Sequence, residues 1–144
     1  MAIDPTRKIV WAPTVRRLCR ARDFMHDSYG EPIDLADIAR AAGLSPFHFQ
    51  RSFHAVFGKT PHQYLTAVRM DRARELLGER GASVTETCIE VGFASVGSFS
   101  TLFRRRTGMS PRQYQAHVRT LVAVPEALPL LHIPHCFAAF FMGA

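Results

Sequence analysis

A repeat with a period of 50 residues restricts the possible folds of this chain more than any other feature. Seven residues recur at this offset: Ser45, Phe49, Phe53, Gly58, Pro61, Gln63 and Tyr64 return as Ser95, Phe99, Phe103, Gly108, Pro111, Gln113 and Tyr114. Thr60 also matches Ser110 conservatively, and Gly43 matches Gly92 at an offset of 49. Helical solenoids repeat at similar periods, but they usually need three or more units, and this chain has two. The repeat therefore predicts two copies of one unit.

Each copy is predicted to be a helix-turn-helix. In the first copy, Asp34 caps a short helix over the sequence LADIARAA, and Gly43 ends it. Ser45 and Pro46 then begin a second helix as its N-cap and first-turn proline, and Gly58 ends that helix. Two helices joined by a short turn that contains glycine are typical of the helix-turn-helix motif.

Further helices flank and join the two copies. A helix over about 14–28 precedes the first copy, and a longer helix over about 62–77 links the copies. The basic positions of the linking helix are Arg69, Arg72 and Arg74. Ser83 and Glu86 form a capping box at the start of the second copy. The pattern therefore predicts an all-α fold.

The helix over 45–58 has an aromatic inner face and an outer face suited to DNA. Its inner face carries Phe49, Phe53 and Val56, at i, i+4 and i+7. Its outer face carries Phe47, Arg51 and His54, with Gln50 beside them. A solvated amphipathic helix has the same periodicity, so this helix alone fits a plain surface helix as well as a reader of nucleic acid.

The charge of the chain favours a nucleic-acid partner. The 144 residues include 18 basic and 12 acidic side chains, which gives a net charge of +6 and a pI near 9.9. Residues 1–119 hold all 18 basic residues and 11 of the acids, a net charge of +7 (18 minus 11). Sixteen of the 18 are arginine, the side chain suited to bidentate contacts with phosphate and guanine.

Cysteine usage and the termini fit a cytoplasmic protein that is not an enzyme. Three widely spaced cysteines argue against a disulfide framework, and Cys19 and Cys88 are expected to be buried, inert thiols. The N-terminus has no signal-peptide pattern. No paired carboxylates, Cys/His or Ser/His arrangement, or glycine-rich phosphate loop has catalytic spacing, so no cofactor is expected.

Two segments resemble the DNA-binding domain of the AraC/XylS family of bacterial transcription regulators. They are LADIARAAGLSPFHFQRSFHAVFGKTPHQYLTAVRMDRARELL and VTETCIEVGFASVGSFSTLFRRRTGMSPRQY, and the second is the more diagnostic. The resemblance covers about residues 14–119 and implies seven helices. It implies one helix-turn-helix subdomain over about 14–60, a linker helix over about 61–78 and a second subdomain over about 83–119. It also implies binding to double-stranded promoter DNA, with RNA polymerase as a neighbour.

The resemblance also carries over the residues that would read DNA. On the first recognition helix these are Phe47, Gln50 and Arg51, flanked by His48 and His54. Glutamine suits adenine, arginine suits guanine, and phenylalanine can lie against a thymine methyl group. On the second helix the corresponding residues are taken as Gly97, Ser98 and Thr101, and the phosphate-holding residues as Arg104, Arg105 and Arg106. We therefore expect the first helix to specify sequence and the second mainly to hold the backbone.

The segment 120–144 has a different composition. It is apolar, its only charged residue is Glu126, and three prolines weigh against one long helix and against a membrane span: Pro125, Pro129 and Pro134. An extended tail packed on the domain or on a second chain is expected first, and a self-association surface second. His132, His135 and Cys136 are metal-ligand types without the spacing of known sites, so no metal is expected.

The tail also carries the alternative function. Most members of the resembled family have a separate effector domain, for which this chain has no room. The chain then either acts alone, or its tail senses a ligand, a metal or a partner. A third interpretation is a fragment of a longer regulator, against which Met1 and the patterned tail weigh.

Overall fold

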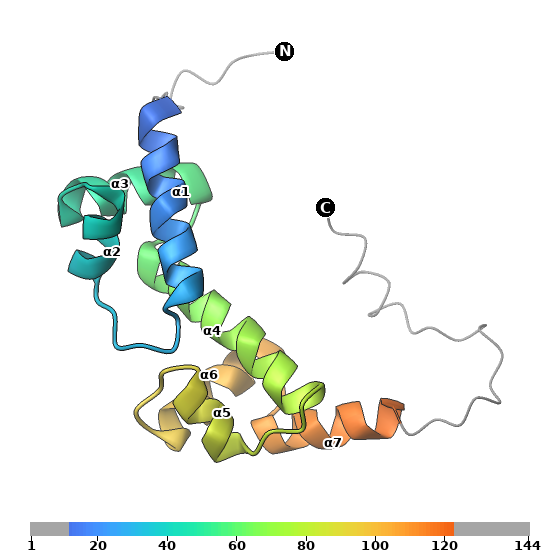
Figure 1. The fold of residues 1–144 in the computed structure, drawn as a ribbon. Coiled ribbons are helices and arrows are strands. Elements are labelled where there is room, and N and C mark those ends of the chain that lie inside the picture. The colour runs from blue at the N-terminus through green and yellow to red at the C-terminus, as the bar shows by residue number, and fades with distance from the viewer. Residues whose placement is uncertain (1–11, 123–144) are drawn as a thin grey trace, which may run out of the picture.

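The computed structural model describes residues 12–122, and within them the chain is entirely helical, as predicted (Figure 1). Seven helices follow one another: α1 (Ala12–Asp27), α2 (Leu35–Ala42), α3 (Pro46–Phe57), α4 (Pro61–Gly78), α5 (Val84–Glu90), α6 (Val96–Thr107) and α7 (Pro111–Val122). Helices α1, α2 and α3 gather around one end of α4, and α5, α6 and α7 gather around its other end (Figure 1). Helix α4 is therefore the linker helix between two helix-turn-helix units.

The linker helix is part of both hydrophobic cores. Leu65, in its first half, packs with the buried residues of α1, α2 and α3. Met70 begins the second core, which continues along α4 through Ala73, Leu76 and Leu77 to α5 and α6. Each unit thus packs apolar side chains against α4, so side-chain packing holds both units to this helix in addition to the chain connection.

The repeat in the sequence is also a repeat in space. In the first unit the rings of Phe49 and Phe53 lie 5.3 Å apart, and Phe53 meets Tyr64 edge-on at 5.5 Å. In the second unit Phe99 and Phe103 lie 5.7 Å apart, and Phe103 meets Tyr114 edge-on at 5.4 Å. The recurring aromatic residues therefore build the same packing arrangement twice.

Glycine forms the turn of both helix-turn-helix units. Gly43 and Gly92 have φ values of +64° and +78°, in the left-handed region that glycine adopts without a steric penalty. The N–H of Leu44 donates to the carbonyl of Ala39 at 3.0 Å, and the N–H of Phe93 donates to that of Cys88 at 3.0 Å. The two turns thus have equivalent hydrogen bonds, in keeping with their offset of 49 residues.

The observed helix ends extend the predicted ones by a few residues. Helix α1 begins at Ala12 rather than near residue 14, because proline is tolerated in a first turn. Helix α7 continues to Val122, so residues 120–122 are helical and not the start of an extended tail. The rest of the predicted tail lies outside the described residues, together with the expectations about self-association, sensing and the ligand types at 132, 135 and 136.

The two described cysteines differ in burial. Cys88 is fully buried, its Sγ–H donates to the carbonyl of Phe93 at 3.5 Å, and burial raises the pKa of its thiol. Cys19 is only half-buried, so its predicted burial is wrong. The inward stripe of α1 runs through Leu18, Ala21 and Met25, and Cys19 lies beside it.

Candidate nucleic-acid interface

Helix α3 is held so that one face points to solvent. The N–H of His48 donates to Oγ of the N-cap Ser45 at 3.4 Å, which helps to fix where the helix begins. Phe49 and Phe53 are completely buried in the first core. All five residues of this helix that are predicted to bind DNA are exposed: Phe47, His48, Gln50, Arg51 and His54.

Phe47 and Arg51 form a pair on that face. The ring of Phe47 is 72% exposed, and the guanidinium carbon of Arg51 lies 5.4 Å from the ring centroid. This distance fits a cation–π contact, which leaves the N–H groups of the guanidinium free to donate elsewhere. The exposed ring of Phe47 therefore serves as a platform under the guanidinium of Arg51.

Helix α6 presents the equivalent face with smaller side chains. Gly97, Ser98 and Thr101 are all exposed. The hydroxyl of Ser98 accepts a hydrogen bond from Oγ of the N-cap Ser95 at 3.0 Å, which commits part of its bonding capacity to the helix cap. A Cβ at Gly97 would meet nothing within 4 Å, so the fold does not require glycine there.

The assignment of Ser98 as the counterpart of Gln50 is wrong. Helices α3 and α6 begin at N-caps exactly one repeat apart, which makes His48 equivalent to Ser98 and Gln50 equivalent to Ser100. Ser100 is only half-buried. Its short hydroxyl side chain offers no longer reach to a base than Ser98 does, so the asymmetry between the two helices stays a prediction, now with Ser100 in place of Ser98.

The last turn of α6 concentrates positive charge. Arg104, Arg105 and Arg106 are exposed, and none of them has a carboxylate partner among residues 12–122. Arg104 occupies the position in α6 that His54 occupies in α3. Arg106 has the register of Val56, which packs against the first core, so it lies toward the edge of the outer face.

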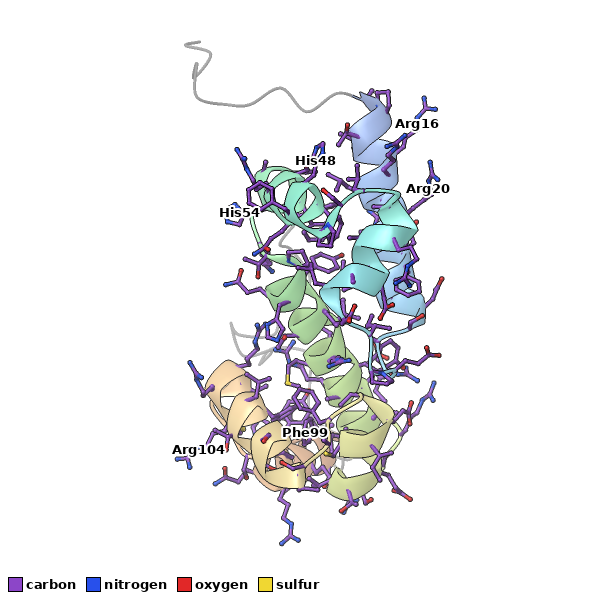
Figure 2. The ribbon with its side chains drawn as sticks, turned by 90° about the vertical axis from the view of Figure 1, so that its left-hand side faces the viewer. Arg16, Arg20, His48, His54, Phe99 and Arg104 are labelled. Carbon is purple, nitrogen blue, oxygen red and sulfur yellow. The ribbon has the colours of Figure 1, made fainter. Side chains whose placement is uncertain are left out.

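The outer faces of α3 and α6 look toward the same side of the molecule. Figure 2 shows His54 on α3 and Arg104 on α6 projecting to this side, whereas Phe99 points inward toward α4. Arg16 and Arg20, on α1, project to the opposite side (Figure 2). Both helices thus present side chains to the same side of the molecule (Figure 2).

The basic residues of the linker helix are used within the protein, which the sequence pattern did not indicate. Arg72 and Arg74 form ion pairs with Glu75 and Asp71, at 2.7 and 2.8 Å. Arg69 is half-buried and donates to two backbone carbonyls of the α1–α2 loop, and burial lowers the pKa of its guanidinium. The positive charge available to a partner therefore comes from other elements.

Residues 12–122 also bear on metal binding and on membrane insertion. No cluster of histidine, cysteine and acidic residues in this part of the chain is arranged to hold a metal ion. Among the helices that the structure describes, none combines the length and the apolar character needed to cross a membrane.

A protein-family model described as a helix-turn-helix domain matches residues 38–117. The transcriptional activator RhaS of Escherichia fergusonii is 37% identical over 100 residues, which cover 69% of this chain and 36% of RhaS. The chain spans less than two fifths of the length of the first curated relatives that it matches.

The fold is similar to those of two solved DNA-binding proteins, among others. One is a transcriptional regulator with an AraC-type DNA-binding domain from Chromobacterium violaceum, with 30% identity, a TM-score of 0.68, and coverage of 75% of this chain and 96% of that one. The other is the DNA-binding domain of the global transcriptional factor AdpA, solved in complex with a target DNA. It has 31% identity, a TM-score of 0.65, and coverage of 76% and 95%.

Proposed function

The chain belongs to the AraC/XylS family of DNA-binding transcriptional regulators, and from this premise we propose that it inserts α3 and α6 into adjacent major-groove segments of promoter DNA. The relatives that match carry the names of transcriptional regulators, which supports the prediction that the chain is not an enzyme. The observation that carries the proposal is the common direction of the two outer faces (Figure 2). A duplex that follows one side of the molecule meets both helices.

The length of the linker helix supports this mode of binding. Its 18 residues give a length of about 27 Å at ~1.5 Å per residue. Successive major-groove segments on one side of B-DNA are ~34 Å apart. Because α3 and α6 lie at opposite ends of α4, a separation of this order is within reach, and modest bending of the duplex would close the remainder.

The two helices are proposed to divide the work of recognition. Gln50 and Arg51 on α3 have the side chains for bidentate contacts with adenine and guanine, and Phe47 can contact a thymine methyl group. Thr101 on α6 reaches only a short distance, whereas Arg104 and Arg105 are suited to phosphate oxygens. Sequence preference would then reside mainly in α3, and salt-dependent affinity would come largely from α6.

Binding titrations of two arginine variants test this division. The DNA would be a site selected from random sequence and a set of its single-base variants. Arg51→Ala should lose discrimination at one position, at a cost of ~1–3 kcal/mol for a lost bidentate contact. Arg105→Ala should weaken binding to all the sequences alike and reduce the slope of log K against log salt by ~1.

Arg20→Ala is the matched control, because it removes the same charge on the opposite side of the molecule (Figure 2). We expect it to leave the discrimination unchanged and to affect the salt slope less than Arg105→Ala does. If Arg51→Ala preserves the full sequence preference, the assignment of specificity to α3 is wrong.

The regulatory outcome is also a proposal. RhaS is named an activator, and by analogy this chain would activate transcription with RNA polymerase bound nearby. A protein with this task would work in the cytoplasm. Transcription in vitro from a promoter that carries the selected site, with purified polymerase and with or without the chain, would measure the sign of the effect.

A further inference from the structure

The two helix-turn-helix units touch each other directly, beside the linker helix. We name this contact the seam: Tyr29 and Gly30 of the α1–α2 loop lie against Glu90 and Gly92 of the second unit, and Arg69 of α4 donates to the loop carbonyls at 29 and 31. Residues 29–31 belong to the first unit and Gly92 to the second. The seam is therefore a second connection between the units, separate from the linker helix.

The backbones approach so closely at the seam that side chains are excluded. A Cβ at Gly30 would lie 2.6 Å from the carbonyl oxygen of Glu90, and a Cβ at Gly92 would lie 2.9 Å from the carbonyl oxygen of Gly30. Both distances are shorter than real Cβ contacts. Gly92 is also required by its positive φ, but Gly30 is not. The need for glycine at Gly30 thus comes from contact between the units alone.

Arg69 holds the loop side of the seam in place. Its Nε donates to the carbonyl of Tyr29 at 2.7 Å, and its Nη2 donates to the carbonyl of Glu31 at 2.9 Å. Its guanidinium carbon also lies 5.9 Å from the ring centroid of Phe93, in the second unit. Charge-assisted hydrogen bonds from a rigid fork fix geometry well, so Arg69 orients the loop toward the other unit.

The seam is continuous with both hydrophobic cores. Tyr29 packs against the buried clusters of the first and of the second unit. Beside the seam, Arg72 forms an ion pair with Glu90 at the end of α5, at 3.4 Å, which holds α4 to α5 within the second unit. Movement of one unit against the other would therefore break backbone packing, hydrogen bonds and an aromatic contact at once.

We propose that the seam sets the spacing between the two DNA segments that this chain accepts. A single helix can bend, and units attached only to its ends could change their relative rotation. A second attachment closes a ring of contacts through α1, the α1–α2 loop, the α5–α6 turn and α4. The two units can then no longer rotate relative to each other. Gly30 and Arg69 then act as positioning residues for α3 and α6. The inference rests on the proposed two-groove binding.

The test compares Gly30→Ala with Gly78→Ala. The first substitution forces the seam apart, whereas a Cβ at Gly78 would meet only the Val118 side chain at 3.5 Å and Tyr114 at 3.7 Å, which are ordinary contacts. Affinities are measured for a selected site and for versions with one base pair inserted into or removed from its centre. Wild type and Gly78→Ala should lose about ten-fold at altered spacing, the order of one lost base-pair contact. Gly30→Ala should lose much less.

Arg69→Gln is the second seam variant, and it applies even if Gly30→Ala fails to fold. It removes the charge and shortens the side chain without adding a Cβ to the contact, and circular dichroism checks that the helices are retained. We expect the same flattened dependence on spacing as for Gly30→Ala. If the folded seam variants discriminate between spacings as sharply as wild type does, the inference is overturned.

A measurement without DNA separates this inference from the proposed function. Spin labels at His54→Cys and Arg104→Cys, in a background without the three native cysteines, report the distance between α3 and α6. The distribution should be narrow with Gly30 present and broad in Gly30→Ala. Equal widths would refute the seam even if DNA binds as proposed. Conversely, a narrow distribution in the labelled protein, together with no specific DNA binding by the unlabelled wild type, would refute the function and not the seam.

Discussion

The contact between Phe47 and Arg51 leads to a quantitative prediction about DNA binding. Phe47→Leu keeps an apolar side chain at this position but removes the aromatic platform under the guanidinium, which lies 5.4 Å from the ring centroid. A cation–π contact at an exposed site is worth about 0.5–1 kcal/mol. If the contact preorganises Arg51 for its base, Phe47→Leu should weaken binding by about two- to five-fold through this route.

A double-mutant cycle isolates this route from a direct contact of Phe47 with a thymine methyl group. Dissociation constants are measured at one salt concentration for wild type, Phe47→Leu, Arg51→Ala and the double variant. Preorganisation predicts a coupling free energy of about 0.5–1 kcal/mol, so Phe47→Leu should cost less when Arg51 is absent. A direct thymine contact alone predicts the same loss in both backgrounds.

Arg20→Ala supplies the control for a change of an exposed side chain that does not touch the pair. Its effect should be the same with and without Arg51, because Arg20 lies on α1 and projects to the opposite side of the molecule (Figure 2). A coupling free energy near zero for Phe47 and Arg51 would refute the reasoning. It would mean that Arg51 leaves the ring when DNA binds, and that the arrangement in the free protein has no part in recognition.

Two further predictions concern stability. Thr87 is fully buried and its Oγ1 has no hydrogen-bond partner within residues 12–122, so Thr87→Val should raise the free energy of unfolding by about 1 kcal/mol, whereas Thr85→Val, on the exposed side of the same helix, should change it little. Urea titrations would show this, and a destabilised Thr87→Val would mean that the hydroxyl is satisfied after all. Glu86 accepts the N–H of Ser83, which holds the pKa of its carboxyl below the ordinary 4.5. A lowered pKa stabilises the folded state above pH 4.5, and this contribution is lost as the pH falls through the folded value, so the stability difference between wild type and Glu86→Gln should shrink below about pH 4.5. A difference that stays constant down to pH 3 would contradict this assignment.

Local features of the sequence were sufficient to predict the fold. Caps and turns act over a few residues, so Ser45, Gly58 and the box from Ser83 to Glu86 mark helix ends without knowledge of the rest of the molecule. The 50-residue repeat then supplies the architecture, because aromatic residues at equal spacing pack in equal ways. The exposure of the predicted α3 residues follows from the same periodicity, although their contacts with DNA stay predictions.

The features that escaped prediction depend on which distant segments meet. Arg69 has the spacing of a solvated linker residue, and only the approach of the α1–α2 loop shows that it binds carbonyls 38 and 40 residues away. In the sequence, Gly30 only marks the end of a helix. In the structure, glycine is required there because a Cβ would clash with the carbonyl oxygen of Glu90. The correspondence of Gln50 with Ser100 follows from the 50-residue repeat alone, and the predicted counterpart, Ser98, departs from that register.

A fixed seam would change the role of weak base contacts on α6. Thr101 and the open position at Gly97 can tell few bases apart, so alone α6 would be a poor reader. If α6 is held at one distance and angle from α3, however, Arg104 and Arg105 can engage phosphates only where the duplex places them correctly. Sequences that bend or twist to meet that geometry at low cost would be favoured. The second unit would then contribute specificity through DNA shape, and loosening the seam should relax the sequence preference in the α6 half-site more than in the α3 half-site.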